Sequence, residues 1–252
     1  MTPGHIVLLA AAGFLAGAIN AVAGGGSLVS FPALLAVGLP SITANVTNTV
    51  ALWPGYVGGA VPYRAELSAQ RSRVIALGLT SLVGAALGAV LLLTTPGSVF
   101  TLLVPYLVLS ACALLAVQPF VAARVAAGAR GRTDAASVLP LHLGVLVASV
   151  YGAYFGAGLG VMLLAILGIL LPEGLSELNG LKNALSLTIN TLALLAFALF
   201  GPVRWVAVLI MAVTSLLGGV AGARVARRLS SQVLRRVVIV FGVVVAVKLL
   251  LA

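Results

Sequence analysis

Charged side chains are scarce in this sequence of 252 residues. Only 7% of the residues are charged, whereas 62% are hydrophobic. A soluble domain carries roughly 25% charged residues, because its surface faces water. The composition therefore excludes an ordinary soluble protein and predicts a protein that is embedded in a membrane.

The alternating pattern of barrel strands is also missing. Such strands place apolar and polar side chains in turn. The sequence instead contains long apolar runs, and a helix of about 20 apolar residues crosses the hydrocarbon core. Runs of about this length occupy 73–94, 98–117, 178–201, 205–223 and 237–251. We therefore predict an all-α polytopic membrane protein.

Acidic residues are fewer still, and all four, Glu66, Asp134, Glu173 and Glu177, lie in or near expected loops. Cation pumps and many proton-coupled carriers depend on a carboxylate within the membrane. The absence of such a group well inside a span counts against a cation as the substrate.

Candidate catalytic groups are nearly absent. Cys112 is the only cysteine, lies in an apolar run and has no evident base beside it, although a reactive thiolate needs one. The two histidines, His5 and His142, lie far apart in sequence at the starts of apolar segments. The sequence therefore predicts no enzyme, no metal site and no cofactor.

Basic residues give a net charge of +10, but eleven of the fourteen lie in three short segments, 64–73, 124–132 and 224–236. Short basic loops stay on the cytoplasmic side of a membrane. We therefore interpret the charge as a topology signal, and we expect no nucleic-acid partner.

Two glycine-rich breaks interrupt apolar runs, at 24-GGGSLVSFP-32 and 156-GAGLG-160. Each break separates a longer segment from a short one, and a Leu-Pro pair ends the short one. A helix and two further spans then follow, so the same order of elements occurs twice. The segments are 5–23, 27–38, 42–60, 73–94 and 98–117 in the first half, and 138–155, 159–171, 176–200, 203–223 and 233–251 in the second. We therefore predict two transmembrane repeats, 1–117 and 138–252, joined by a basic cytoplasmic linker at 118–137.

The orientation of the repeats follows from length and charge. Segment 159–171 spans only ~20 Å at 1.5 Å per residue, short of a ~30 Å hydrocarbon core. We expect each short segment to fold back as a re-entrant hairpin, although halves of one kinked span remain an alternative. Each half then makes three net crossings, so the repeats are inverted and both termini lie outside. Inverted repeats with broken helices are a transporter architecture.

The breaks themselves are candidate binding elements. A helix that begins inside the membrane points free backbone N–H groups into the break, and this arrangement suits an anion. The candidates are Gly24, Gly25, Gly26 and Ser27 in the first break, and Gly156, Gly158 and Gly160 in the second. Close helix packing is the alternative role of small residues, and we assign it to Gly55/Gly59, Gly84/Gly88 and Gly218/Gly222.

The helix after each break carries a polar stripe. Side chains three, four and seven residues apart share one helix face, and amide side chains can replace water around a polar solute. The candidates are Asn20, Asn45, Thr47 and Asn48 in the first half, and Asn179, Lys182, Asn183, Ser186 and Asn190 in the second. A cation within a span is a candidate site. Lys182 could instead extend to the interface or pair with Glu173 or Glu177.

The motifs as a set resemble those of the sulfite exporter TauE/SafE family. They comprise the glycine run with Ser27 and Pro32, then 38-GLP-40, 44-ANVTNT-49 and, in the second half, 182-KN-183. The resemblance covers about 7–250. It implies a bacterial inner-membrane permease for small sulfur-containing anions, and Gly24 to Ser27, Thr47, Asn48, Lys182 and Asn183 match its motifs. One departure is 45-NVTN-48, which is richer in Asn than the family's commoner Ala-x-Gly-Thr form.

From these observations we expect a secondary transporter of small sulfur-containing anions, such as sulfite or organosulfonates, working by alternating access. The expected partners are the anionic substrate and membrane lipid, and a homo-oligomer is left open. The alternatives are a passive anion channel of the same fold, or a carrier of another carboxylate or a neutral solute.

Overall fold

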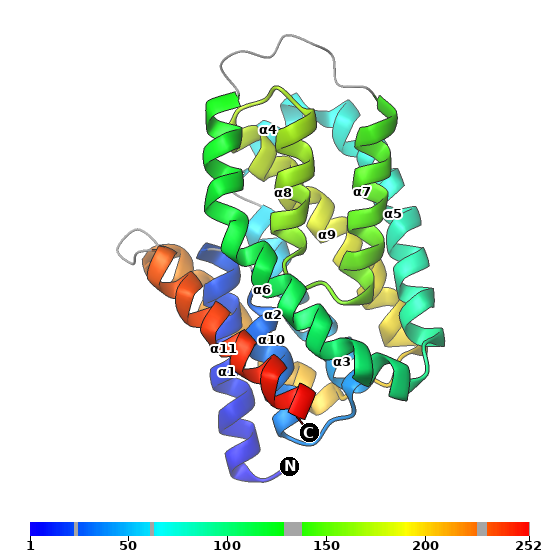
Figure 1. The fold of residues 1–252 in the computed structure, drawn as a ribbon, viewed down its shortest axis with the longest axis vertical. Coiled ribbons are helices and arrows are strands. Elements are labelled where there is room, and N and C mark those ends of the chain that lie inside the picture. The colour runs from blue at the N-terminus through cyan, green and yellow to red at the C-terminus, as the bar shows by residue number, and fades with distance from the viewer. Residues whose placement is uncertain (23–24, 61–62, 129–137, 226–230, 252) are drawn as a thin grey trace.

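The computed structural model of the chain describes residues 1–22, 25–60, 63–128, 138–225 and 231–251, and these form helices with no strand among them (Figure 1). The predicted all-α class is therefore confirmed. The helices are α1 (Pro3–Val22), α2 (Ser27–Ala36), α3 (Ser41–Ala60), α4 (Arg64–Ala69), α5 (Arg71–Thr94), α6 (Gly97–Gly128), α7 (Val138–Tyr154), α8 (Leu159–Leu170), α9 (Leu175–Phe200), α10 (Trp205–Val225) and α11 (Ser231–Leu251).

The helix boundaries agree with the predicted segments to within a few residues, except in two places. The short helix α4 was not expected. Helix α6 continues through Gly128, well into the expected linker, with Pro119 inside it. The residues after Pro119 are mostly apolar, and proline is tolerated inside membrane helices because other groups satisfy the freed carbonyl. The remainder of the expected linker, 129–137, lies outside the described residues.

The two short helices fold back on the longer helices that precede them. Helix α2 packs on α1, and α8 packs on α7. In Figure 1, α7 begins at the upper end of the molecule and α8 returns to that end. With 12 residues, α8 is only ~18 Å long. Both pairs are therefore antiparallel hairpins rather than single kinked helices.

The outer surface is apolar, as lipid requires. Leu79, Val83, Leu87 and Val90 recur along one face of α5 and are each more than half exposed. Contiguous exposed apolar surface of this kind is rare on soluble proteins. Within the described residues, four helical segments are long and apolar enough to cross a membrane by length and composition: Pro3–Asn20, Arg71–Thr94, Gly97–Arg124 and Leu175–Phe200.

Packing between the halves is reciprocal. Helix α1 packs on α10 as α7 packs on α5, and α3 packs on α10 as α9 packs on α5. Likewise, α11 contacts α2 as α6 contacts α8. Exchanging the two halves therefore maps each of these contacts onto its partner. This reciprocity supports two related repeats, while the inversion of one repeat relative to the other remains a prediction.

Glycines allow the closest of these contacts. A Cβ atom on Gly17 of α1 would lie 1.9 Å from the Ser215 carbonyl oxygen of α10. A Cβ atom on Gly88 of α5 would lie 2.3 Å from the Val150 carbonyl oxygen of α7. Small residues at such crossings let helix backbones approach closely in lipid. The predicted packing role is confirmed for Gly84, Gly88 and Gly218, which meet neighbouring backbone in the same way.

Substituting Gly88 should weaken the α5–α7 contact. We expect Gly88→Ala to lower the free energy of unfolding by about 1–3 kcal/mol, because the new methyl group overlaps backbone that must move away. Gly78→Ala is the matched control on the same helix, since no atom lies within 4 Å of its new Cβ. It should be neutral, or stabilising by up to about 1 kcal/mol. Thermal unfolding of both purified variants in detergent checks this, and equal stability of the two would contradict it.

Candidate functional site

Backbone geometry at the two breaks requires glycine. Gly25 has a φ of 91° in the first break, and Gly156 and Gly158 have φ values of 79° and 80° in the second. Residues with a side chain are strained at these positive φ values, whereas glycine adopts them freely. The chain can therefore end one helix and start the next within four residues at each break.

Asn20 and Gly26 hold the first break closed. The Gly26 N–H donates a hydrogen bond of 2.8 Å to Asn20 Oδ1, which satisfies a donor at the start of α2 that has no intrahelical acceptor. A Cβ atom on Gly26 would lie 2.2 Å from the Ala16 carbonyl oxygen. Gly26 therefore serves the tight α1–α2 hairpin and does not line the cavity described below. Gly24 lies outside the described residues.

The second break is held partly from the other half of the chain. Asn45 on α3 donates from Nδ2 to the Tyr154 carbonyl oxygen at 2.8 Å, at the C-terminus of α7, where carbonyls lack intrahelical partners. The Tyr151 hydroxyl donates to the Ala157 carbonyl oxygen at 2.7 Å. The side chain of Asn45, which we had expected in a binding stripe, thus supports the break geometry.

Both breaks open onto one cavity of about 70 Å³. Its walls come from α3, from α9 and from the two breaks, so the cavity lies where the halves meet. The lining residues are Asn20, Gly25, Ser27, Gly55, Tyr56, Gly156, Gly158, Leu159, Gly160, Lys182, Asn183 and Ser186. The structure therefore gathers nine of the predicted site residues from both halves around one space.

Lys182 gives this cavity its charge. It is the one charged residue in the lining, and among the described residues no carboxylate lies within 4 Å of its ammonium group. Glu173, suggested as a partner, forms an ion pair with Arg73 instead. The Lys182 side chain passes close to Gly160, whose added Cβ would lie 3.7 Å from Lys182 Cδ. The ammonium is therefore available to the cavity rather than to a loop carboxylate.

Helix N-termini add to the positive potential. Helices α2 and α8 begin at Ser27 and Leu159, which both line the cavity, and the first N–H groups of a helix carry partial positive charge. No Asp or Glu lines the cavity. In the described part of the chain, no three His, Cys, Asp or Glu side chains come together as metal ligands would. The lining thus suits a small solute of negative charge.

The other predicted polar residues have protein partners instead of facing the cavity. On α3, Asn48 Oδ1 accepts from the Ser30 hydroxyl at 2.5 Å, and Thr47 Oγ1 accepts from the Arg204 N–H at 3.1 Å. On α9, the amides of Asn179 and Asn190 donate to main-chain oxygens one turn earlier. Thr47, Asn48 and Asn190 thus satisfy polar groups inside the bundle, as buried polar side chains usually do, whereas Asn179 is only partly buried.

Sequence reasoning missed Gly55, Tyr56 and Leu159. Gly55 was assigned to helix packing, but no atom lies within 4 Å of its added Cβ, and it lines the cavity. Tyr56 lies beside the Asn190 side chain. Gly55 and Tyr56 continue the face of Asn45, Asn48 and Thr49 by two further turns, so extending the stripe past Pro54 would have included them among the candidates.

Comparisons with known proteins agree with this architecture. The family model described as Sulfite exporter TauE/SafE matches residues 9–249. A protein of Sinorhizobium sp. named probable membrane transporter protein ORF9 is 26% identical over 249 residues, covering 97% of this chain and 92% of its own length.

Two further relatives carry similar names. A probable membrane transporter protein of Haemophilus influenzae is 26% identical over 251 residues, covering 97% of this chain and 94% of its own. The probable membrane transporter protein YfcA of Escherichia coli K12 is 27% identical over 239 residues, covering 94% and 86%. No solved structure matches this chain. The chain is therefore a multi-pass membrane transporter rather than an enzyme, and it belongs to the sulfite exporter TauE/SafE family.

Proposed function

We propose that this transporter carries a small sulfur-containing anion, with sulfite as the first candidate, through the cavity around Lys182. The observation that carries the proposal is the convergence on one cavity of both helix breaks and a lysine with no carboxylate beside it. A cation at membrane depth is costly unless something compensates it. A bound anion would supply that compensation.

The size of the cavity favours the smaller members of the substrate class. One water needs ~10–15 Å³ of such space, so about 70 Å³ accommodates a solute of a few heavy atoms. Sulfite fits this description better than an organosulfonate with an extended carbon chain. Asn20, Asn183 and Tyr56 bring polar groups to the same lining and would hydrogen-bond the oxygen atoms of the anion.

Alternating access is the mechanism that this arrangement favours. The cavity lies between halves that pack reciprocally, and each half contributes one broken hairpin. Transporters built from repeats place the substrate at such an interface and move one repeat against the other. Rocking of the halves would then expose Lys182 to each side of the membrane in turn.

Lys182 should be required for transport. We expect Lys182→Gln to reduce the initial rate of labelled sulfite uptake into proteoliposomes by about 10- to 100-fold, since a hydrogen bond to a charged group contributes about 1.5–3 kcal/mol. Lys248→Gln is the matched control, because Lys248 is the only other lysine and lies exposed at the end of α11. Sulfate, thiosulfate and a simple sulfonate are tested beside sulfite.

The outcomes of this uptake experiment are distinct. An equal loss of sulfite uptake in both lysine variants would assign the effect to poor folding or insertion of the protein rather than to the cavity. Uptake of none of the four anions would leave a neutral solute as the next candidate. Counterflow separates the carrier from a passive channel, because a carrier accumulates label in exchange for unlabelled substrate and an open pore does not.

Filling the cavity should stop transport without unfolding the protein. We expect Gly160→Val to abolish uptake, since its side chain would extend toward Lys182 into the available space. Gly160→Ala adds a methyl group at ordinary contact distance and should retain part of the activity. Melting temperatures of both variants in detergent provide the control, and full uptake by Gly160→Val would contradict the assignment of the cavity.

The same proposal places the protein in the bacterial inner membrane with its basic loops in the cytoplasm and both termini outside. In Figure 1 the N- and C-termini lie at one end of the molecule, opposite the end where α6 finishes and α7 begins. Helix α4, the start of α5 and the end of α6, which carry Arg64, Arg71, Arg73 and Arg124, lie toward that opposite end, as expected for the cytoplasmic side.

Reporter fusions test this topology. Alkaline phosphatase fused after Ala252 should be active, because that enzyme needs the oxidising periplasm. Green fluorescent protein fused at the same position should stay dark, because it would be exported in an unfolded form. The reverse pattern would invert the whole assignment of sides.

A further inference from the structure

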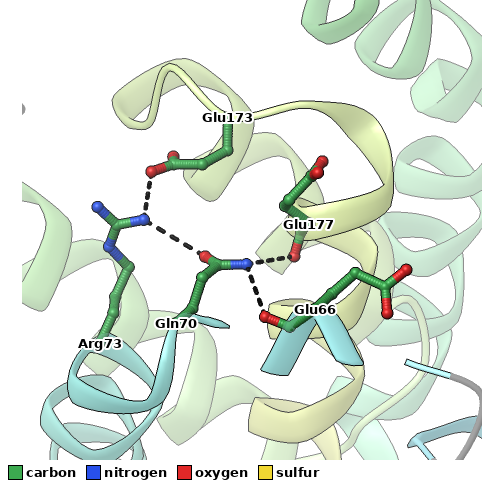
Figure 2. A network of polar contacts seen from close by, with 5 residues as sticks. All are labelled: Glu66, Gln70, Arg73, Glu173 and Glu177. Atoms are coloured by element: carbon green, nitrogen blue, oxygen red, sulfur yellow. Dashed lines mark hydrogen bonds and ion pairs between the residues drawn. The ribbon is translucent and has the colours of Figure 1, made fainter. Parts of the chain in front are cut away.

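Acidic residues gather at one end of the molecule. Glu66, Glu173 and Glu177 are three of the four in the chain, and they lie where α4 and α5 meet the connection from α8 to α9 (Figure 2). This end also holds Arg73, which forms with Glu173 the one ion pair among the described residues. Neither the cavity lining nor the proposed substrate explains this cluster.

The contacts in this cluster join the two halves of the chain. Arg73 Nη1 pairs with the Glu173 carboxylate and also donates to Gln70 Oε1 at 3.3 Å. Gln70 Nε2 in turn donates to the main-chain oxygen of Glu177 at 3.4 Å. Figure 2 shows the Glu177 carboxylate pointing away from Gln70, so only its backbone takes part. We call Gln70, Arg73 and Glu173 the latch.

The latch bonds to the first turn of α9, the helix that carries Lys182 further along. Lys182 follows Glu177 by five residues, ~7.5 Å along α9. Between them, an added Cβ on Gly180 would lie 3.3 Å from Tyr63 Cβ and 3.5 Å from Glu66 Cβ. The segment around α4 therefore packs against α9 two residues before Lys182 in the sequence. Helix α8 begins in the cavity lining and leads to Glu173 at its other end.

The opposite end of the bundle is joined differently. One cross-half contact there is the Arg204 N–H donating to the Thr47 hydroxyl at 3.1 Å, and Thr47 is fully buried. This bond involves no side-chain charge. The two ends of the cavity thus differ in chemistry, with an ion pair at one end and a neutral buried contact at the other.

The geometry points to a gate: the latch closes the cavity toward the end of the molecule where α6 finishes and α7 begins, and it must break each time the substrate passes on that side. This inference rests on the proposed transport function. Arg73 and Glu173 are 35% and 21% exposed, and ion pairs of this kind contribute little net free energy. Arg73 and Glu173 also border a separate cavity of about 680 Å³. Such a contact is weak enough to open and re-form in each cycle.

Charge reversal tests the latch without reference to a substrate. The reporter is Ser186→Cys in the cavity, in a Cys112→Ser background that removes the single native cysteine. A membrane-impermeant maleimide is added to vesicles of either orientation. We expect Arg73→Glu to raise the labelling rate from the latch side by about two- to tenfold, through repulsion from Glu173.

Restoration makes the charge-reversal result specific. The double variant Arg73→Glu/Glu173→Arg re-creates an opposite-charge pair and should return labelling to the starting rate. Arg71→Glu is the matched control, because Arg71 is exposed and lies two residues before Arg73 on α5. This variant should leave the labelling rate unchanged. Unchanged labelling in Arg73→Glu, or failure of the double variant to restore it, would overturn the inference.

A disulfide provides a second test that does not depend on the charge variants folding. The Cβ atom of Glu66 and an added Cβ atom on Gly180 would lie 3.5 Å apart. This separation suits a disulfide, whose Cβ atoms lie about 3.5–4.5 Å apart. In the Cys112→Ser background, oxidation of Glu66→Cys/Gly180→Cys should abolish sulfite uptake, and dithiothreitol should restore it. Either single-cysteine variant should be insensitive to oxidation. Full uptake by the oxidised pair would contradict the gate.

The two readouts separate the gate from the transport proposal. If no anion is transported but labelling follows the latch charges, the proposed substrate class fails and the gate stands. If sulfite is transported while neither labelling nor uptake responds to the latch and the disulfide, the gate fails and the transport function stands.

Discussion

The structure depends on satisfying backbone groups at two places where helices stop inside the membrane. An unpaired N–H or C=O in hydrocarbon costs several kcal/mol, so a break survives only where protein or a water-filled cavity satisfies it. Here Asn20 accepts from the Gly26 N–H, and Asn45 donates to the Tyr154 carbonyl oxygen. Both breaks also border the cavity around Lys182. The amide side chains placed beside the two breaks follow from this requirement.

The same requirement divides the polar residues into two groups. Asn45, Thr47 and Asn48 are buried; the first two bond to the second half, and Asn48 bonds to Ser30 of its own half. Lys182, Asn183 and Ser186 border the cavity. Residues of similar chemistry on two corresponding helices therefore have different roles, and the second-half helix supplies most of the polar groups available to a solute.

The sequence predicted the fold well because its signals are local. Glycine runs, Leu-Pro ends and apolar lengths marked nearly every helix and both breaks. Which stripe residues face the cavity could not be predicted, because it depends on how α3 and α9 rotate against their neighbours. Gly55 illustrates this, since spacing alone made it a packing glycine, while the structure places nothing within 4 Å of its added Cβ.

The bond from Asn45 to the Tyr154 carbonyl also has a consequence for how the chain is made. The first break is completed by Asn20 from its own hairpin, whereas the second receives an amide from α3, synthesised about a hundred residues earlier. Synthesis proceeds from the N-terminus, and earlier segments can fold before later ones emerge. The first half can therefore assemble as a finished template, and the second half completes its break only by docking against it.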